Sequence, residues 1–131
     1  MSKKKFDKNQ SAIIVPVSVE AGGITSDFEF VVGTGSVETL ITEKALKAMG
    51  YTPEDSVEKE QTERGIIYRY IVDSITAIGI TRRNVKVKAQ QMPNGSGVYG
   101  LLGLDFFENT RLTINFKEGE IMVEENEKND E

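Results

Sequence analysis

The chain of 131 residues contains no cysteine and no histidine. Without cysteine it can form neither a disulfide framework nor a thiolate metal site. Without histidine it lacks every Ser-His or Cys-His catalytic pair and the commonest zinc ligand. Carboxylates, hydroxyls, lysines and backbone amides are the groups left for chemistry. We therefore expect no cofactor and no metal.

Long apolar runs are also absent. No segment approaches the roughly 20 apolar residues of a membrane-spanning helix, and residues 3–10 are too polar for the core of a signal peptide. The formal net charge is −5 and the pI is near 4.9, with one basic cluster at Lys3–Lys5. This acidity argues against nucleic acid or an anionic membrane as the partner. We expect a cytoplasmic protein with no nucleic-acid and no membrane partner.

The length fits a single domain, and a hydrophobic content of 38% is enough for a modest core. Residues 1–10 and 124–131 are charged and poor in apolar residues, which predicts a flexible N-terminal tail and a flexible acidic C-terminal tail. The predicted domain therefore covers residues 11–123.

Apolar residues alternate with polar ones through most of this domain, which predicts strands. A first hairpin turns at residues 21–23, and Pro16 in its first strand predicts an edge or a bulge. Further strands are predicted at 75–80, 85–89, 112–116 and 121–123. Asp105 is predicted to cap a short helix that runs to residue 109.

A helix and a second hairpin lie between these strands. Thr42 can cap a helix whose apolar stripe precedes Gly50, a residue suited to a left-handed stop. Residues 58–72 then predict a hairpin with its turn at 62–65 and a return strand rich in β-branched and aromatic residues. The fold class is therefore mainly β, with one or two short helices.

Two glycine-containing motifs stand out. Residues 30–36 read Phe-Val-Val-Gly-Thr-Gly-Ser, an apolar strand that runs into a turn of small residues. Residues 100–106 read Gly-Leu-Leu-Gly-Leu-Asp-Phe, with two leucines and a glycine before a short helix. In this order, with a hairpin between them, they resemble the retropepsin-like aspartic proteases, the retroviral type that acts as a homodimer.

The resemblance extends over nearly all of residues 13–123 and implies a closed or partly open β-barrel in a homodimer. It places Gly33 where the family has its catalytic aspartate, with Thr34 and Gly35 completing the catalytic turn. The Thr34 hydroxyl would bond across the two-fold axis to the matching turn of the partner.

The resemblance also implies the substrate contacts. The turn Thr62, Glu63, Arg64 and Gly65 would be the tip of the flap, the hairpin that closes over substrate. A peptide or protein substrate would lie extended beneath it and pair with main chain as an added strand.

Glycine at position 33 removes the reacting group that the resemblance requires. In such a dimer two carboxylates share one proton, so that one accepts a proton from water while the other protonates the peptide carbonyl. The other acids considered, Asp27, Glu38, Asp73 and Asp105, are not convincing replacements. We therefore predict an aspartic endopeptidase framework that binds extended peptides and is inactive unless aspartate is restored at position 33.

Several alternatives stay open at this point. Gly33 is either a native residue of a non-catalytic peptide-binding or dimerisation module, or an inactivating substitution in an active protease. A nucleotide-binding turn is a weaker alternative, because Glu38 takes the place of the third glycine of that fingerprint. A small all-β domain without a site would use Gly33 and Gly35 only for backbone conformation.

Overall fold

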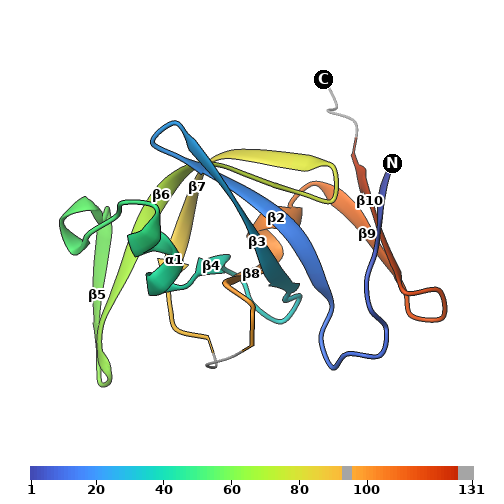
Figure 1. Cartoon of the computed structure of the whole chain (residues 1–131), viewed down its shortest axis with the longest axis horizontal. Helices are drawn as coiled ribbons and strands as arrows, with labels where there is room; N and C mark the ends of the chain where they lie inside the picture. The colour runs from blue at the N-terminus through green and yellow to red at the C-terminus, as the bar shows by residue number, and fades with distance from the viewer. Residues whose placement is uncertain (93–95, 127–131) are drawn as a thin grey trace.

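The computed structural model describes residues 1–92 and 96–126, and within them the chain is almost entirely β (Figure 1). Its elements in chain order are β1 (Ser2–Lys5), β2 (Ile14–Ala21), β3 (Ile24–Val32), β4 (Leu40–Ile41), α1 (Glu43–Ala48), the 3-10 helix η1 (Pro53–Asp55), β5 (Glu58–Thr62), β6 (Gly65–Ala77), β7 (Ile80–Ala89), β8 (Gly100–Leu102), the 3-10 helix η2 (Leu104–Phe107), β9 (Thr110–Asn115) and β10 (Glu120–Glu125).

Six strands close into a barrel. They follow the order β2-β3-β8-β4-β7-β6, and β2 also pairs with β6 to complete the ring. The predicted mainly β fold with a closed barrel and few helices is therefore confirmed. Inward-facing apolar side chains fill the barrel, among them Val15, Val17 and Val19 from β2 and the fully buried Phe30 from β3.

Among the residues that the structure describes, the strand β5 pairs only with β6, and it lies outside the closed ring. Together with the first part of β6 it forms the hairpin that the sequence predicts around residues 62–65, and Figure 1 shows this hairpin extending beyond the barrel. We call β5 and residues 65–69 of β6 the flap hairpin. From Arg69 onward β6 pairs with β7 within the ring.

A separate three-stranded sheet has the order β1-β10-β9. Residues Ser2 to Lys5 pair antiparallel with Val123 to Glu120. Part of the predicted N-terminal tail of residues 1–10 is thus a strand, because β10 offers it a free edge that the local composition does not reveal. Of the predicted C-terminal tail, Glu124 and Glu125 continue β10, and residues 127–131 lie outside the described residues.

Two other strand predictions need correction. The segment 75–80 is not one strand, because the chain turns at Ile78 and Gly79 between β6 and β7. Strand β2 has a neighbour on each side, but its pairing with β6 begins at Val17. Pro16 therefore lies just outside that ladder, where its missing N–H leaves no sheet hydrogen bond unmade.

The helix prediction is confirmed. Thr42 caps α1 by accepting a hydrogen bond from the Ala45 N–H at 3.1 Å, and Gly50 follows the helix with φ of 98°. No helix in the described parts of the chain is long and apolar enough to cross a membrane. The proline and glycines of residues 92–97 predict a loop. This segment lies partly outside the described residues.

Candidate functional site

The two glycine-containing motifs lie side by side. Strands β3 and β8 run parallel, with Val31 opposite Leu101 and Val32 opposite Leu102. At the end of β3 the Gly33 N–H donates to the Leu102 carbonyl at 2.9 Å. The two motifs are thus neighbours in the fold although they lie far apart in the sequence. The predicted site requires this proximity.

The turn after β3 is tight and open to solvent. Its closing hydrogen bond runs from the Ser36 N–H to the Gly33 carbonyl at 3.0 Å. Thr34 and Gly35 at its tip are both exposed, whereas Gly33 is partly covered. The Thr34 hydroxyl is thus available for a contact outside its own chain.

A buried polar contact fastens this turn to the second motif. The fully buried Thr39 donates from its hydroxyl to one Asp105 carboxylate oxygen at 2.6 Å and from its N–H to the other at 3.1 Å. The same hydroxyl accepts the Gly103 N–H at 3.0 Å. Asp105 therefore satisfies groups that water cannot reach.

The helix-cap prediction for Asp105 is wrong. Asp105 lies inside η2, whose N-cap is Gly103 and which receives no side-chain cap. Its carboxylate binds Thr39 instead, because β4, which follows Thr39, pairs with β8, which precedes η2. The short helix ends at Phe107, two residues earlier than predicted.

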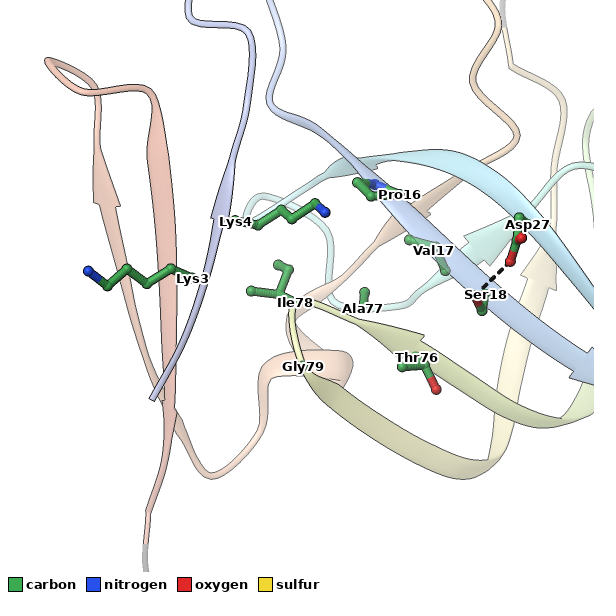
Figure 2. Close-up of a pocket in the computed structure, with 10 residues that line it drawn as sticks. All are labelled: Lys3, Lys4, Pro16, Val17, Ser18, Asp27, Thr76, Ala77, Ile78 and Gly79. Carbon is green, nitrogen blue, oxygen red and sulfur yellow. Dashed lines mark hydrogen bonds between the residues drawn. The ribbon is translucent and has the colours of Figure 1, made fainter.

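The other acids considered from sequence are also bonded away from Gly33. Asp27 accepts the Ser18 hydroxyl at 2.7 Å beside an open pocket of about 500 Å³ near β1 and the β6–β7 turn (Figure 2). Asp73 lies within β6 and accepts the Gly22 N–H at 2.9 Å. Both carboxylates thus accept hydrogen bonds from other parts of the chain.

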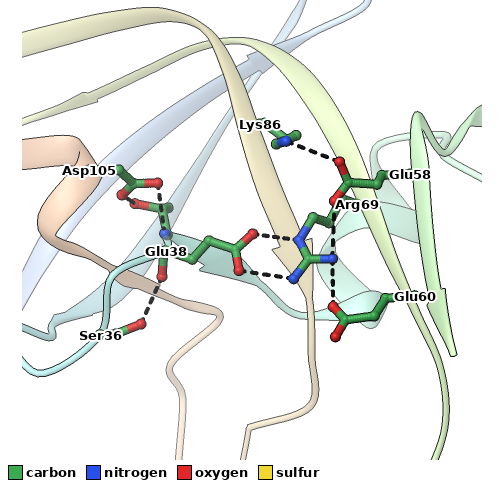
Figure 3. A network of polar contacts seen from close by, with 8 residues as sticks. Ser36, Glu38, Glu58, Glu60, Arg69, Lys86 and Asp105 are labelled. Carbon is green, nitrogen blue, oxygen red and sulfur yellow. Dashed lines mark hydrogen bonds and ion pairs between the residues drawn. The ribbon is translucent and has the colours of Figure 1, made fainter. Parts of the chain in front are cut away.

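Glu38 belongs to an ionic cluster centred on Arg69 (Figure 3). Arg69 donates to both Glu38 carboxylate oxygens, at 2.6 and 3.1 Å, and its Nη1 lies 3.2 Å from Glu58 and 2.9 Å from Glu60. The Arg69 side chain is only 12% exposed. Lys86 makes a further ion pair with Glu58 at 3.2 Å.

This cluster connects the flap hairpin to the segment that follows the Gly33 turn. Arg69 comes from β6, Glu58 and Glu60 come from β5, and Glu38 precedes β4. Hydrogen bonding to Arg69 lowers the pKa of Glu38, while the carboxylates raise the pKa of Arg69. Arg69 thus holds the base of the flap hairpin against the segment that follows the Gly33 turn.

The tip of the flap hairpin is held by local bonds. The Thr62 hydroxyl donates to the Gly65 carbonyl at 2.8 Å and accepts the Arg64 N–H at 3.2 Å. Gly65 has φ of 120°, a conformation that side chains other than glycine rarely adopt. Glu63 and Arg64 are exposed at the turn.

Sequence reasoning does not reveal the roles of Arg69 and Thr39. Arg69 carries a signal in hindsight, since it is the one cation in the apolar run of residues 66–72. Thr39 looks like an ordinary strand residue. Its importance arises from contacts across the fold.

Residues 15–106, well over half of the chain, match the family model described as aspartyl protease. The chain belongs to the aspartyl protease family. Its fold is similar to the crystal structure of a retropepsin-like aspartic protease from Rickettsia conorii, with a TM-score of 0.67 and 16% identity over 92% of this chain and 87% of that one. The resemblance to retropepsin-like proteases is thus confirmed. No curated protein gave a match.

The ionic cluster around Arg69 predicts that the stability of this aspartyl protease family member depends on pH. The pKa of Glu38 is lower in the folded chain than its ordinary value of 4.5, so the contact with Arg69 stabilises the fold above that pH and is lost as pH falls through the folded pKa. We expect Glu38→Gln to cost about 1 kcal/mol or less at neutral pH. Its cost should shrink as pH falls below 4.5 and should vanish only below the lowered pKa of the folded state.

Urea denaturation of the wild-type chain and the Glu38→Gln variant from acid to neutral pH measures this difference. The matched control is Glu54→Gln, since Glu54 is exposed and forms no ion pair within the described residues. A cost for Glu38→Gln that stays constant with pH would contradict the assignment.

Proposed function

We propose that two copies of this chain form a cleft that binds an extended peptide without hydrolysing it. The proposal rests on the family and on the geometry around Gly33. Family membership supplies the expectation of a dimer in which each chain contributes one turn like that at Gly33. The exposed Thr34 tip is suited to that contact.

Peptide binding needs main-chain partners and a hairpin that can fold over the ligand. Within the described parts of the chain, one edge of β5 is unpaired, and this edge can accept an added strand. Its tip carries Thr62, Glu63, Arg64 and Gly65, the residues proposed to contact substrate. Arg69 holds the base of the hairpin in place before any ligand arrives, which reduces the ordering cost of binding.

The proposed lack of hydrolysis rests on one observation, which is that position 33 has no carboxylate. A homodimer would double the glycine, so both the general acid and the general base would be lost together. Asp27, Glu38, Asp73 and Asp105 are each bonded to a partner elsewhere. The proposed function is therefore binding, with the family's hydrolytic chemistry removed.

A library of extended, apolar peptides tests this function with the full-length chain. We expect saturable binding by fluorescence anisotropy, a dimer in sedimentation, and intact peptides by mass spectrometry between about pH 4 and 7. Cleavage that is inhibited by pepstatin-like compounds would contradict the inactivity. A monomer without peptide affinity would overturn the proposal.

Two glycine variants locate the binding surface. Gly65→Ala strains the flap tip and is expected to weaken peptide binding about tenfold or more. Gly23→Ala places the same strain in the β2–β3 turn, since both glycines have positive φ and a Cβ atom added to either one meets nothing within 4 Å. Equal affinities of the two variants would show that the flap hairpin does not contact the peptide.

A further inference from the structure

A gap separates the three-stranded sheet from the barrel, and β1 forms one of its walls. Within the described residues β1 is an edge strand, because it pairs only with β10. The Phe6 N–H donates to the Gly119 carbonyl at 2.9 Å, and hydrogen-bonded pairs alternate with unbonded ones along an antiparallel ladder. The main-chain groups of Lys4 therefore face β10, whereas those of Lys3 and Lys5 face the gap.

The opposite wall of the gap is the first half of β2. The Val32 N–H donates to the Ile13 carbonyl at 2.8 Å, so the odd-numbered residues of β2 bond to β3 and the even-numbered ones face the other way. On that side the ladder with β6 begins only at Val17. The main-chain groups of Ile14 and the Pro16 carbonyl thus have no strand beside them within the described parts of the chain.

Two open pockets lie in this gap. One, of about 500 Å³, lies between β1 and residues 16–18 of β2 (Figure 2). The other, of about 260 Å³, is lined by Lys5 at the end of β1 and by Ile14 and Pro16 of β2. Because Pro16 lines both pockets, they adjoin each other along the gap. The space between the two strand edges is therefore suited to an extended segment of chain.

The charge available in the gap is mainly positive. Figure 2 shows the Lys4 side chain extending from β1 towards β2. Among the described residues, the side chains of Lys3–Lys5 take part in no ion pair. Of the carboxylates that line the pockets, Asp7 and Asp27 already accept hydrogen bonds within the chain, which leaves Glu29. Acidic side chains in the gap would complement the lysines.

We propose that an acidic peptide segment of a partner protein adds as a strand in this gap, between β1 and the first half of β2. Its main chain pairs with Lys3 and Lys5 on one side and with Ile14 on the other. Its acidic side chains lie beside Lys4. Lysines on an edge strand discourage pairing with other chains, so the segment must carry the opposite charge. This surface is separate from the peptide cleft proposed above and gives a role to the one basic cluster of an acidic chain.

Fluorescence anisotropy with the full-length chain tests the proposal. The probe is a labelled hexapeptide of alternating glutamate and valine. One matched peptide has lysine in place of glutamate, and the other has methylated main-chain nitrogens. We expect saturable binding of the glutamate peptide that weakens with added salt, and binding at least about tenfold weaker for both matched peptides. Equal binding of the methylated peptide would show attraction by charge alone and would overturn strand addition.

Two lysine variants locate the surface, because both remove the same charge from the same strand. Lys4→Glu is expected to weaken binding of the glutamate peptide about tenfold. Lys3→Glu should weaken it less than about threefold, since Figure 2 shows the Lys3 side chain pointing away from β2. Equal losses for the two variants would overturn the proposal. So would a Lys4→Glu chain that loses a dimer and keeps its affinity for the peptide, because a second copy would then occupy the gap.

Amide hydrogen exchange followed by NMR tests the pairing in the unmodified chain. The glutamate peptide should slow exchange at the N–H groups of Lys3, Lys5 and Ile14, and unchanged exchange at all three would contradict strand addition. Gly65→Ala at the tip of the flap hairpin should leave the affinity for the glutamate peptide unchanged. Failure of this surface and failure of the proposed peptide cleft are therefore distinguishable.

Discussion

Replacing Gly33 by aspartate is expected to create peptide cleavage in a chain that lacks it. The aspartate supplies one carboxylate from each copy at the proposed dimer axis. One carboxylate takes a proton from the attacking water while the other protonates the peptide carbonyl. We expect a gain of at least about 100-fold in peptide hydrolysis near pH 5 over the wild-type chain.

The matched control for this variant is Gly33→Asn, in which the side chain has the size of aspartate and no titratable group. Cleavage should follow a bell-shaped pH profile only in the aspartate variant. A folded, dimeric Gly33→Asp variant that remains inactive would indicate a pure binding module without a latent protease site.

Local sequence signals predict much of this fold. The helix after Thr42 needs only its cap, its apolar stripe and Gly50, all of them close together in the chain. The flap hairpin is similarly local, since Gly65 directly follows the turn and β-branched residues form the return strand. These elements are predictable because the interactions that define them involve neighbours in sequence.

The unpredicted turn at Ile78 and Gly79 has a clear physical cause. Ile78 has φ of 51°, which a β-branched residue rarely adopts, so the sequence there looks like an uninterrupted strand. Long β6 and β7 ladders on either side hold the turn in place. Strand β1 is unpredicted for a related reason, since three successive lysines become a strand only because β10 offers an edge.

The candidate site is predictable in its motifs and not in its contacts. The spacing of the two glycine-containing motifs predicts that they meet, because each ends a strand of the same barrel. The bond between Thr39 and Asp105 spans 66 residues, and the one between Glu38 and Arg69 spans 31. Patterns in a single sequence do not indicate which distant residues pair. The partners of Asp105 and Glu38 are therefore known only from the folded structure.

Removing the Asp105 carboxylate is expected to cause a large loss of stability. Asp105→Ala leaves the buried Thr39 hydroxyl and N–H without their shared acceptor, in a place where water does not replace it. We expect a cost of about 2–4 kcal/mol in the free energy of unfolding, measured by urea denaturation. The turn at Gly33 should loosen as well, because Asp105 anchors the segment that leads from it.

Asp105→Asn distinguishes the hydrogen bonds from simple packing. The amide oxygen can accept one of the two Thr39 donors, but its NH2 group faces the other, so this variant should lose about half as much stability as Asp105→Ala. Thr39→Val should fall between them, because it removes the hydroxyl and leaves the N–H bond to Asp105. Hydrogen exchange at the Gly103 N–H should accelerate in Thr39→Val, since that N–H donates to the Thr39 hydroxyl. If all three variants unfolded at the same urea concentration as the wild type, Asp105 would contribute nothing that holds the two motifs together.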